Sequence, residues 1–300
     1  MKSVWKGDDA RATLASWHDK FRAQLAAPTE SRTVATRFGP THVLVGGAPS
    51  APPLVILHGA LASSAHLLLE LQHLLAHFRI YAVDVVGQSV KSADARPSVA
   101  NNEYGEWLVE VVDQLGLDRF ALLGVSWGGF VATRFAVVAP SRITHLALLV
   151  PAGIVKGSAW AGLTKLAWPM TMYRLFPSEK RLAKFTSNLL TTADDALWRP
   201  YLGEAFRSYN LDMRVPMLAK PEELAALTAP TLVVAADRDV SFPGRALLDR
   251  ARVLFPNCRE ELLENCLHSP PTTDEFRRSF GDRLTLFFQT PGVTASQLKA

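Results

Sequence analysis

The sequence predicts an α/β protein with a mostly parallel sheet, helices on both faces of that sheet and a helical insertion. Three observations predict this class. Short apolar runs alternate with amphipathic segments from residue 53 to residue 150, the order that gives parallel strands with crossover helices. The alternation stops over residues 156–222 and resumes near residue 230. With 300 residues, 48% of them hydrophobic, the chain has enough apolar side chains for one large core.

The individual elements follow from the periodicity of the apolar residues. Apolar side chains recur every three or four positions from residue 1 to about residue 27, which predicts a helix that ends at Pro28. Residues 33–38 and 42–45 flank Gly39-Pro40 and predict two strands joined by a hairpin turn. The other six strands of an eight-stranded sheet are expected at 53–57, 79–83, 120–123, 143–150, 230–236 and 260–264. Helices are expected at 66–77, 103–115, 130–139, 243–254 and 274–289.

The pentapeptide from Gly124 to Gly128, with Ser126 at its centre, stands between an apolar run and an almost wholly apolar segment that stops at Pro140. In a strand–turn–helix context, Gly-x-Ser-x-Gly is typical of a nucleophile elbow, a strained turn that exposes the serine hydroxyl above a sheet. Glycines are needed where the chain passes too close for a side chain. The adjoining helix N-terminus favours negative charge. Ser126 is therefore the candidate nucleophile.

Residues 156–222 are expected to form a helical cap on a core made of residues 1–155 and 223–300. The segment holds short helical patterns interrupted by prolines, and no good strand pattern. Aromatic residues and methionines crowd its first half, and such side chains usually pack against another surface. Because the segment follows the strand after the Ser126 helix, we expect it to cover Ser126 as a lid.

A serine hydroxyl needs a base to take its proton, and the base needs a third group to orient it. Of the eight histidines, His268 follows the last predicted strand, so it is expected at the same edge of the sheet as Ser126. His66, His73 and His77 share one predicted helix and are expected at the surface or rim. His145 lies within a buried strand and is expected to be a core histidine. His268 is the candidate base.

The acid is expected after the strand that begins at Thr231. Asp237 and Asp239 both stand there, and either could reach His268. The resulting order along the chain, serine then aspartate then histidine, is the one that this topology uses.

Backbone N–H groups are needed to stabilise an oxyanion. Trp127, the residue after the candidate nucleophile, is expected to supply one of them. The turn after His58-Gly59 is expected to supply the other, from Ala60 or, as the alternative, from Leu61. We interpret His58 as a structural residue that holds this turn.

These segments together resemble the α/β-hydrolase fold superfamily, the group that includes carboxylesterases, cofactor-free haloperoxidases and carbon–carbon bond hydrolases. The resemblance runs from residue 53 to residue 268 and rests on the His58-Gly59 turn, the Asp84-x-x-Gly87-x-Ser89 segment, the elbow, the aspartate segment and the final histidine. Trp5, residues 36–39 and residues 57–64 resemble bacterial carboxylesterase-like members in particular.

The resemblance also separates the two aspartates. In this family the acid sits in a Gly-Glu-x-Asp segment shortly before a proline, which implies that Asp239 is the acid and that Asp237 stands at the Glu position. Two residues depart from the pattern: Ala236 replaces the glycine of that segment, and Leu267 stands where a glycine usually precedes the histidine. The resemblance assigns Asp84 to the support of its loop.

The expected function is a serine hydrolase that cleaves carboxylic esters through an acyl-enzyme on Ser126, without a cofactor. Serine at this position argues against the dehalogenase and epoxide hydrolase relatives, which use a carboxylate nucleophile. Carbon–carbon bond hydrolases, aminopeptidases, perhydrolases and acyltransferases use the same triad and stay open as alternatives. A non-catalytic ligand-binding protein of the same fold is a further alternative. The apolar cap favours small, hydrophobic acyl or aryl esters.

Composition narrows the function classes further. The formal charge of +4 comes without a lysine/arginine block, which gives no support to nucleic-acid binding. No apolar stretch approaches the ~18 residues that span a bilayer, and no Cys or His spacing suggests a metal site. Cys258 and Cys266 are too far apart for a disulfide if the chain between them is extended. Free thiols and the absence of an apolar export signal favour the cytoplasm.

Overall fold

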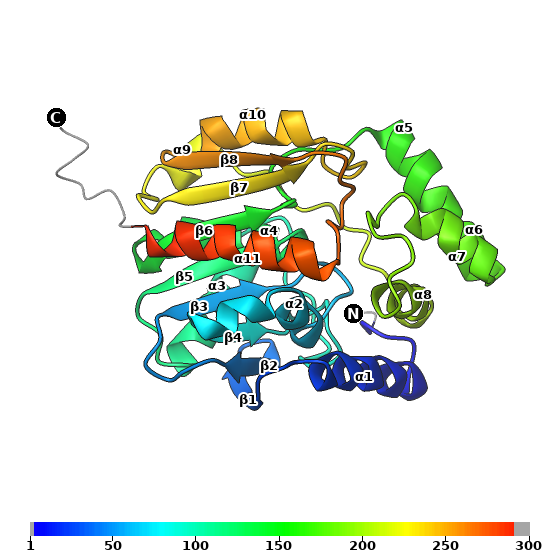
Figure 1. The fold of residues 1–300 in the computed structure, drawn as a ribbon, viewed down its shortest axis with the longest axis horizontal. Helices are drawn as coiled ribbons and strands as arrows, with labels where there is room; N and C mark the ends of the chain where they lie inside the picture. Colours follow the sequence, from blue (N-terminus) through cyan, green and yellow to red (C-terminus); the bar gives the residue numbers. More distant parts are fainter. Residues whose placement is uncertain (1–2, 291–300) are drawn as a thin grey trace.

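The computed structural model describes residues 3–290, and these form an eight-stranded sheet in the order β1-β2-β4-β3-β5-β6-β7-β8 (Figure 1). The two pairs that involve β2 are antiparallel, and the other five pairs are parallel. The predicted mostly parallel sheet is therefore confirmed. The strands are β1 (Thr29–Thr36), β2 (Gly39–Gly46), β3 (Pro53–Leu57), β4 (Arg79–Val83), β5 (Phe120–Val125), β6 (Ile143–Leu149), β7 (Thr231–Ala236) and β8 (Cys258–Leu263).

Helices cover both faces of the sheet (Figure 1). The helices of this layer are α1 (Asp8–Ala23), α2 (Ser64–Glu70), α3 (Glu103–Gln114), α4 (Trp127–Val138), α9 (Pro221–Leu224), α10 (Gly244–Leu254) and α11 (Asp274–Gln289), with the 3-10 turns η1 (Gln72–Ala76) and η2 (Pro140–Arg142). Alternate residues of β3 enter different cores: Leu54 and Ile56 pack with α1, α2 and α11, whereas Val55 and Leu57 pack with α3 and α4. Burial on both faces explains the unbroken apolar runs of the parallel strands.

The segment between β6 and α9 is helical and lies beyond the carboxyl ends of the parallel strands (Figure 1). It contains α5 (Ala159–Ala161), the π-helix η3 (Gly162–Ala167), α6 (Trp168–Leu175), α7 (Glu179–Thr186) and α8 (Trp198–Ser208). The π-helix directly precedes α6, whose second residue is Pro169, and the proline ring removes one helical hydrogen bond. Within residues 3–290, no helix is both long and apolar enough to cross a bilayer.

The N-terminal helix differs from the prediction at both ends. It was expected over residues 1 to about 27, of which residues 1 and 2 lie outside the described range. The helix begins at Asp8, after Gly7 with a φ of +98°, and ends at Ala23. Trp5 instead forms an isolated bridge with Tyr209, which follows α8. Pairing with a distant segment therefore overrides the helical periodicity of the first residues.

The hairpin turn lies two residues earlier than predicted. Thr36 pairs with Gly39, so the turn consists of Arg37 and Phe38, and Pro40 lies within β2 opposite Ala35. Because Thr36 and Gly39 close a two-residue turn, the Ala35–Pro40 pair does not exchange hydrogen bonds across the hairpin. A proline, which has no N–H group, is tolerated at such a position.

The helix predicted over residues 66–77 is divided in two. α2 ends at Glu70, Leu71 leaves the helical conformation with a φ of −114°, and η1 continues as a tighter turn. Leu74 and Leu75 remain buried in this arrangement. The apolar periodicity therefore identified the buried side chains correctly but not the break.

A buried carboxylate ties the end of β4 to β2 and to the start of α2. Asp84, directly after β4, is fully buried and accepts four hydrogen bonds. Two come from Ser64 at the start of α2 (N at 3.0 Å, Oγ at 2.5 Å), one from Ser89 Oγ (2.6 Å) and one from His42 Nδ1 (2.7 Å). Burial alone would raise the pKa of Asp84, but the hydrogen bond from His42 and the nearby histidines hold it well below its usual range.

The same network holds the turn after β3. The buried His58 ring donates from Nδ1 to Gly59 O (2.7 Å) and accepts at Nε2 from Val85 N (2.9 Å), so it joins the ends of β3 and β4. The interpretation of His58 as a structural residue is confirmed by these contacts, and so is the assignment of Asp84 to loop support.

We predict that Asp84→Asn destabilises the protein by about 3–5 kcal/mol, because an amide cannot accept all four bonds and leaves buried donors unpaired. Urea unfolding followed by circular dichroism measures this loss. Asp249→Asn is the matched control, since the Asp249 side chain is 74% exposed, and it should stay within about 0.5 kcal/mol of wild type. A destabilisation of Asp84→Asn no larger than that of the control would contradict the importance of this network.

Candidate active site

Ser126 sits on a strained turn between β5 and α4. Its φ of +50° and ψ of −110° lie outside the ordinary regions for a residue with a side chain. The flanking glycines are required by close contacts. A Cβ at Gly124 would lie 2.4 Å from Gly128 O, and a Cβ at Gly128 would lie 2.2 Å from Leu57 O. The predicted collision of side chains at positions 124 and 128 is confirmed.

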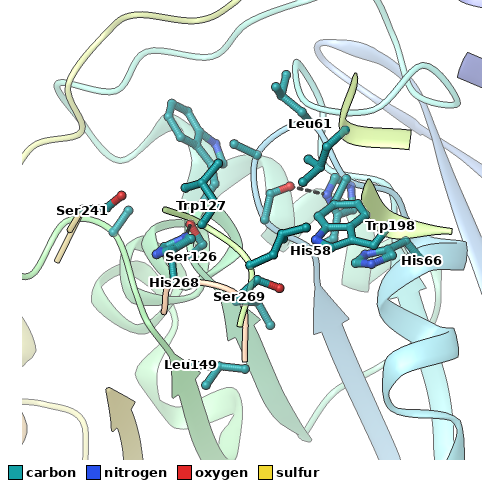
Figure 2. Close-up of a pocket in the computed structure, with 18 of the residues that line it drawn as sticks. His58, Leu61, His66, Ser126, Trp127, Leu149, Trp198, Ser241, His268 and Ser269 are labelled. Carbon is teal, nitrogen blue, oxygen red and sulfur yellow. Dashed lines mark hydrogen bonds between the residues drawn. The ribbon is translucent and has the colours of Figure 1, made fainter. Parts of the chain in front are cut away.

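The structure brings Ser126 and His268 together, although 142 residues of chain separate them. His268 lies in the loop between β8 and α11, and its Nε2 is 2.9 Å from Ser126 Oγ. Figure 2 shows the two side chains meeting at one end of the pocket, beside Trp127. The His268 Nδ1 atom lies 2.7 Å from Asp239 Oδ2. The three side chains therefore form one hydrogen-bonded chain.

The two candidate aspartates have different contacts. Asp239 is buried; its Oδ2 faces His268, and its Oδ1 accepts from Ser241 N (2.7 Å) and Phe242 N (3.1 Å). Asp237 instead accepts at Oδ1 from Cys266 N (3.0 Å). Asp239 therefore contacts the histidine, whereas Asp237 braces the loop that carries it.

The environment of His268 raises its pKa. Burial of the ring lowers the pKa, but the charge of Asp239 and the hydrogen bond to it raise the pKa by more, so that it lies above the ordinary value of 6.5. The imidazole in this position is a stronger base than a free histidine. A base of this kind is suited to accepting the proton of the serine hydroxyl.

Free backbone N–H groups surround Ser126. Within the described part of the chain, the N–H groups of Ala60 and Leu61 donate no hydrogen bond, and neither does that of Trp127, the first residue of α4. Ala60, Leu61 and Trp127 all line the same pocket as Ser126. The turn approaches Ser126 closely, since a Cβ on Gly59 would lie 3.4 Å from Ser126 Cβ.

A tyrosine of α8 holds the turn that contains Leu61. The buried Tyr201 hydroxyl donates a hydrogen bond to Leu61 O, and Leu61 has a φ of +59°. Tyr201 is itself packed between Trp198, against which it stacks at 5.3 Å, and the edges of Trp17 and Phe21. Sequence reasoning missed this residue, because nothing in the local pattern around position 201 points to a turn 140 residues earlier.

The segment after α7 is bonded to the histidine loop. Thr191 Oγ1 accepts from Leu267 N (2.9 Å) and donates to Ser269 O (2.8 Å), and Ser269 N donates to Leu189 O (2.8 Å). Leu267, which replaces the glycine of the family pattern, is thus accommodated beside the helical segment. These bonds hold the residues on both sides of His268.

A cavity of about 510 Å³ adjoins Ser126 and His268. Leu149 and Ala152 of the core and Leu166, Met170 and Phe206 of the helical segment are among the residues that line it. The wall also includes an ion pair, in which Arg277 contacts Glu70 at 2.8 Å and 2.9 Å. The cavity therefore has a mostly apolar wall, shared between the core and the helical segment.

The prediction that His66 lies at the surface or rim is wrong. His66 is buried in the wall of the cavity and stacks on Trp198 with ring centroids 3.7 Å apart (Figure 2). Burial lowers the pKa of His66 to about 3, so the ring is neutral. His73 and His77 are exposed as expected. His145 is buried, and its Nε2 donates to Thr290 O at 2.8 Å, as expected of a core histidine.

A candidate metal-binding group lies outside the cavity. The ligand atoms of His18, His42 and Asp84 lie within 4.8 Å of one another. The carboxylate of Asp84, however, already accepts four hydrogen bonds, which is the number that its oxygens can take. We therefore assign this cluster a structural role.

Comparisons with known proteins agree with this architecture. The family model described as the alpha/beta hydrolase fold matches residues 52–183. An uncharacterised carboxylesterase of Bacillus subtilis is 28% identical over 78% of this chain and 79% of its own length. The carboxylesterase YbfK of the same organism is 27% identical over 80% of this chain and 83% of its own length. The crystal structure of a naproxen esterase from Bacillus subtilis superposes with a TM-score of 0.81, at 23% identity, over 95% of this chain and all of that chain.

The sheet order, the elbow and these comparisons define an α/β-hydrolase-fold protein. Among proteins of that fold, the chain is similar along most of its length to bacterial carboxylesterases. The resemblance inferred from the sequence is thereby confirmed.

Proposed function

We propose that this protein is a serine hydrolase that cleaves carboxylic esters. The observation that carries the proposal is the continuous chain of hydrogen bonds from Ser126 Oγ through the His268 ring to Asp239. The similarity to carboxylesterases over about four-fifths of the chain supports the same reaction.

In the proposed mechanism, Ser126 Oγ attacks the ester carbonyl while His268 Nε2 accepts the hydroxyl proton. Asp239 holds the ring with its Nδ1–H toward the carboxylate and stabilises the imidazolium that forms. His268 then gives the proton to the leaving alcohol, which leaves an acyl group on Ser126. Water attacks this acyl-enzyme with His268 again as the base, and the acid is released. The reaction requires no cofactor.

The oxyanion of each tetrahedral intermediate is stabilised by Trp127 N–H and by the turn after Gly59, with Ala60 as the proposed donor. The support for this proposal is that Ala60, Leu61 and Trp127 line the cavity beside Ser126 and that the described structure gives their N–H groups no hydrogen-bond acceptor; Leu61 is the alternative donor. Tyr201 acts as a positioning residue, because its bond to Leu61 O fixes the conformation of the turn.

The helical segment of residues 156–222 is the cap of this active site, over a core of residues 1–155 and 223–300. Its side chains form part of the cavity wall next to Ser126. The apolar wall favours small esters with a hydrophobic acyl or aryl group. Carbon–carbon bond hydrolysis, peptide hydrolysis and acyl transfer use the same triad, but no contact in this cavity favours them. The thiols of Cys258 and Cys266 are free, which supports a cytoplasmic location.

We expect a fluorophosphonate probe to label the native protein at Ser126, since the probe reacts with a serine that a base has activated. Ser126→Ala should lose labelling and lower the turnover of p-nitrophenyl esters on the order of 10⁵-fold. Gel fluorescence and ester hydrolysis measure the two effects, and a screen of acyl chain lengths identifies the preferred acyl group. Absence of labelling, or equal labelling of the alanine variant, would disprove the enzymatic function.

The two aspartates can be separated by matched substitutions. Asp239→Asn should lower kcat on the order of 10⁴-fold, because the amide no longer orients and stabilises the imidazolium. Asp237→Asn should stay near wild type, since its Oδ1 can still accept from Cys266 N. The reverse result would exchange the two roles.

The pH dependence supplies a second readout of the same pair. Protonated His268 cannot take the serine proton, so activity should fall as the pH drops through the pKa of His268. Because that pKa is raised, the midpoint of kcat/KM should lie above 6.5 in the wild type. Loss of the carboxylate charge in Asp239→Asn should move the midpoint of its residual activity to lower pH. An unchanged midpoint would show that Asp239 is not what raises the pKa of His268.

Tyr201→Phe removes one hydroxyl and leaves the ring packing unchanged. Without the bond to Leu61 O the oxyanion turn is less well placed, so kcat should fall about tenfold while KM changes little. Tyr173→Phe, in α6, is the matched control and should keep wild-type kcat. Steady-state kinetics measure both variants. A rise in KM at constant kcat would instead assign Tyr201 to substrate binding.

A further inference from the structure

The outer face of the first cap helices exposes large apolar side chains. Trp160 is 74% exposed, Trp168 62% and Leu163 53%, and Leu175 and Phe176 at the end of α6 are 65% and 55% exposed. We call these five residues the cap patch. Figure 1 shows that α5, α6 and α7 form an outer edge of the molecule, away from the sheet. Single exposed apolar residues are ordinary, whereas a group of this size on one element marks an interaction site.

The helical geometry separates the cap patch from the cavity. Gly162, Leu166 and Met170 of the same element line the cavity. Leu163 and Trp168 are more than half exposed, whereas Gly162, Leu166 and Met170 are only partly exposed. The continuous helical stretch of α5, η3 and α6 is therefore apolar on two sides. One side lines the cavity, and the other side is exposed.

The segment that carries the cap patch is rich in positive charge. Residues 156–184 contain six basic residues and one acidic residue, a net charge of +5, whereas the whole chain has a formal charge of +4. The acidic residue, Glu179, is paired with Arg199 at 2.6 Å. Within the described residues, Lys165, Lys180 and Lys184 form no ion pair, and all three are exposed. The excess positive charge of the protein is thus concentrated on this edge.

We propose that the cap patch docks on the surface of a lipid bilayer that contains anionic lipids. Exposed tryptophan, leucine and phenylalanine side chains on a helical element can enter the boundary between head groups and acyl chains, while lysines around them bind the anionic head groups. Tryptophan is favoured at that boundary because one end of the ring is apolar and the other is polar. A second copy of this chain is a poorer partner, since two faces of net charge +5 would oppose each other.

Docking in this way would bring the cavity close to the lipid. Met213 and Val215, in the loop after α8, are 72% and 68% exposed, and Met213 lines the cavity. An exposed apolar residue of this loop thus also reaches the cavity wall. If the proposed ester hydrolysis is correct, the substrates include apolar esters dissolved in the membrane.

The experiment is sedimentation of the full-length protein with sucrose-loaded vesicles. Vesicles of phosphatidylcholine alone are compared with vesicles of equal parts phosphatidylcholine and phosphatidylglycerol. We expect the protein to sediment with the anionic vesicles, and added salt to weaken this binding. The double variant Trp160→Ser with Trp168→Ser should bind at least about tenfold more weakly. The triple variant Lys165→Gln, Lys180→Gln and Lys184→Gln should bind on the order of a hundredfold more weakly.

Matched controls test whether the location of these residues matters. Val253→Ser with Leu286→Ser removes two side chains of similar exposure from α10 and α11. Arg119→Gln, Arg245→Gln and Arg278→Gln together remove three exposed charges from the core. Both control proteins should bind vesicles like the wild type. Neither Trp160 nor Trp168 lines the cavity, so their variants should hydrolyse a water-soluble ester at the wild-type rate.

Three results would overturn the proposal: equal binding to neutral and anionic vesicles, no binding to either, or wild-type binding by the tryptophan variant. Light scattering tests whether a second copy of the chain covers the cap patch instead. If the wild type is a dimer and the tryptophan substitutions dissociate it, the cap patch is assigned to a second copy. Ser126→Ala separates this proposal from the enzymatic one. It should bind vesicles like the wild type although it hydrolyses no ester.

Discussion

The left-handed backbone of Ser126 is the constraint on which the rest of the site depends. A side chain at a φ of +50° is unfavourable by roughly 1–3 kcal/mol, so the surrounding chain must hold it there. Ser126 N donates to Leu149 O, and Ser126 O accepts from Gly129 N, both at 2.9 Å, which ties the turn to β6 and to α4. Side chains at Gly124 and Gly128 would collide with the backbone of Gly128 and of Leu57, next to this turn. Burial of the apolar side chains of β5 and α4 in the core offsets the unfavourable free energy of this conformation.

Three carboxylates of this region have different roles because their hydrogen-bond partners differ. Asp239 faces the histidine ring, and Asp237 holds the backbone of the loop that carries the histidine. Asp84, directly after β4, joins that strand to β2 and to the start of α2. Asp84 and Asp239 are buried, and each is paired with hydrogen-bond donors, as a buried charge must be. The proposed chemistry uses one of the three directly, and the other two fix the positions of the groups around it.

Most of the fold and the central residues of the site could be predicted from the sequence. Strands buried on both faces must be apolar throughout, so an apolar run such as residues 53–57 predicts a buried strand at that place in the sequence. The edge at which parallel strands end then places Ser126, His268 and the aspartates together. Asp237 and Asp239 could not be separated by these rules, because both follow β7. The resemblance to the family favoured Asp239, and the directions of the two side chains in the structure distinguish them.

The remainder depended on contacts between distant segments. The bridge of Trp5 with Tyr209, the bond of Tyr201 to Leu61 and the stacking of His66 on Trp198 leave no local pattern. The charge of the cap escapes a search for basic blocks, because its lysines and arginines are mostly several residues apart. The hairpin turn was predicted at the wrong position because Pro40 was interpreted as a turn residue. A proline can also occupy a strand position that needs no N–H donor.

The hydrogen bonds between residues 189–191 and the His268 loop divide the proposed cap into two parts that can be changed independently. Residues 156–176 contribute cavity wall and outer surface but make no hydrogen bond to the His268 loop in the described structure, so this part can diverge or be grafted between relatives to alter specificity. Residues 189–208 hold the histidine loop and the oxyanion turn from outside. A chimera that exchanges the whole of residues 156–222 would therefore also exchange the residues that support the proposed catalytic groups.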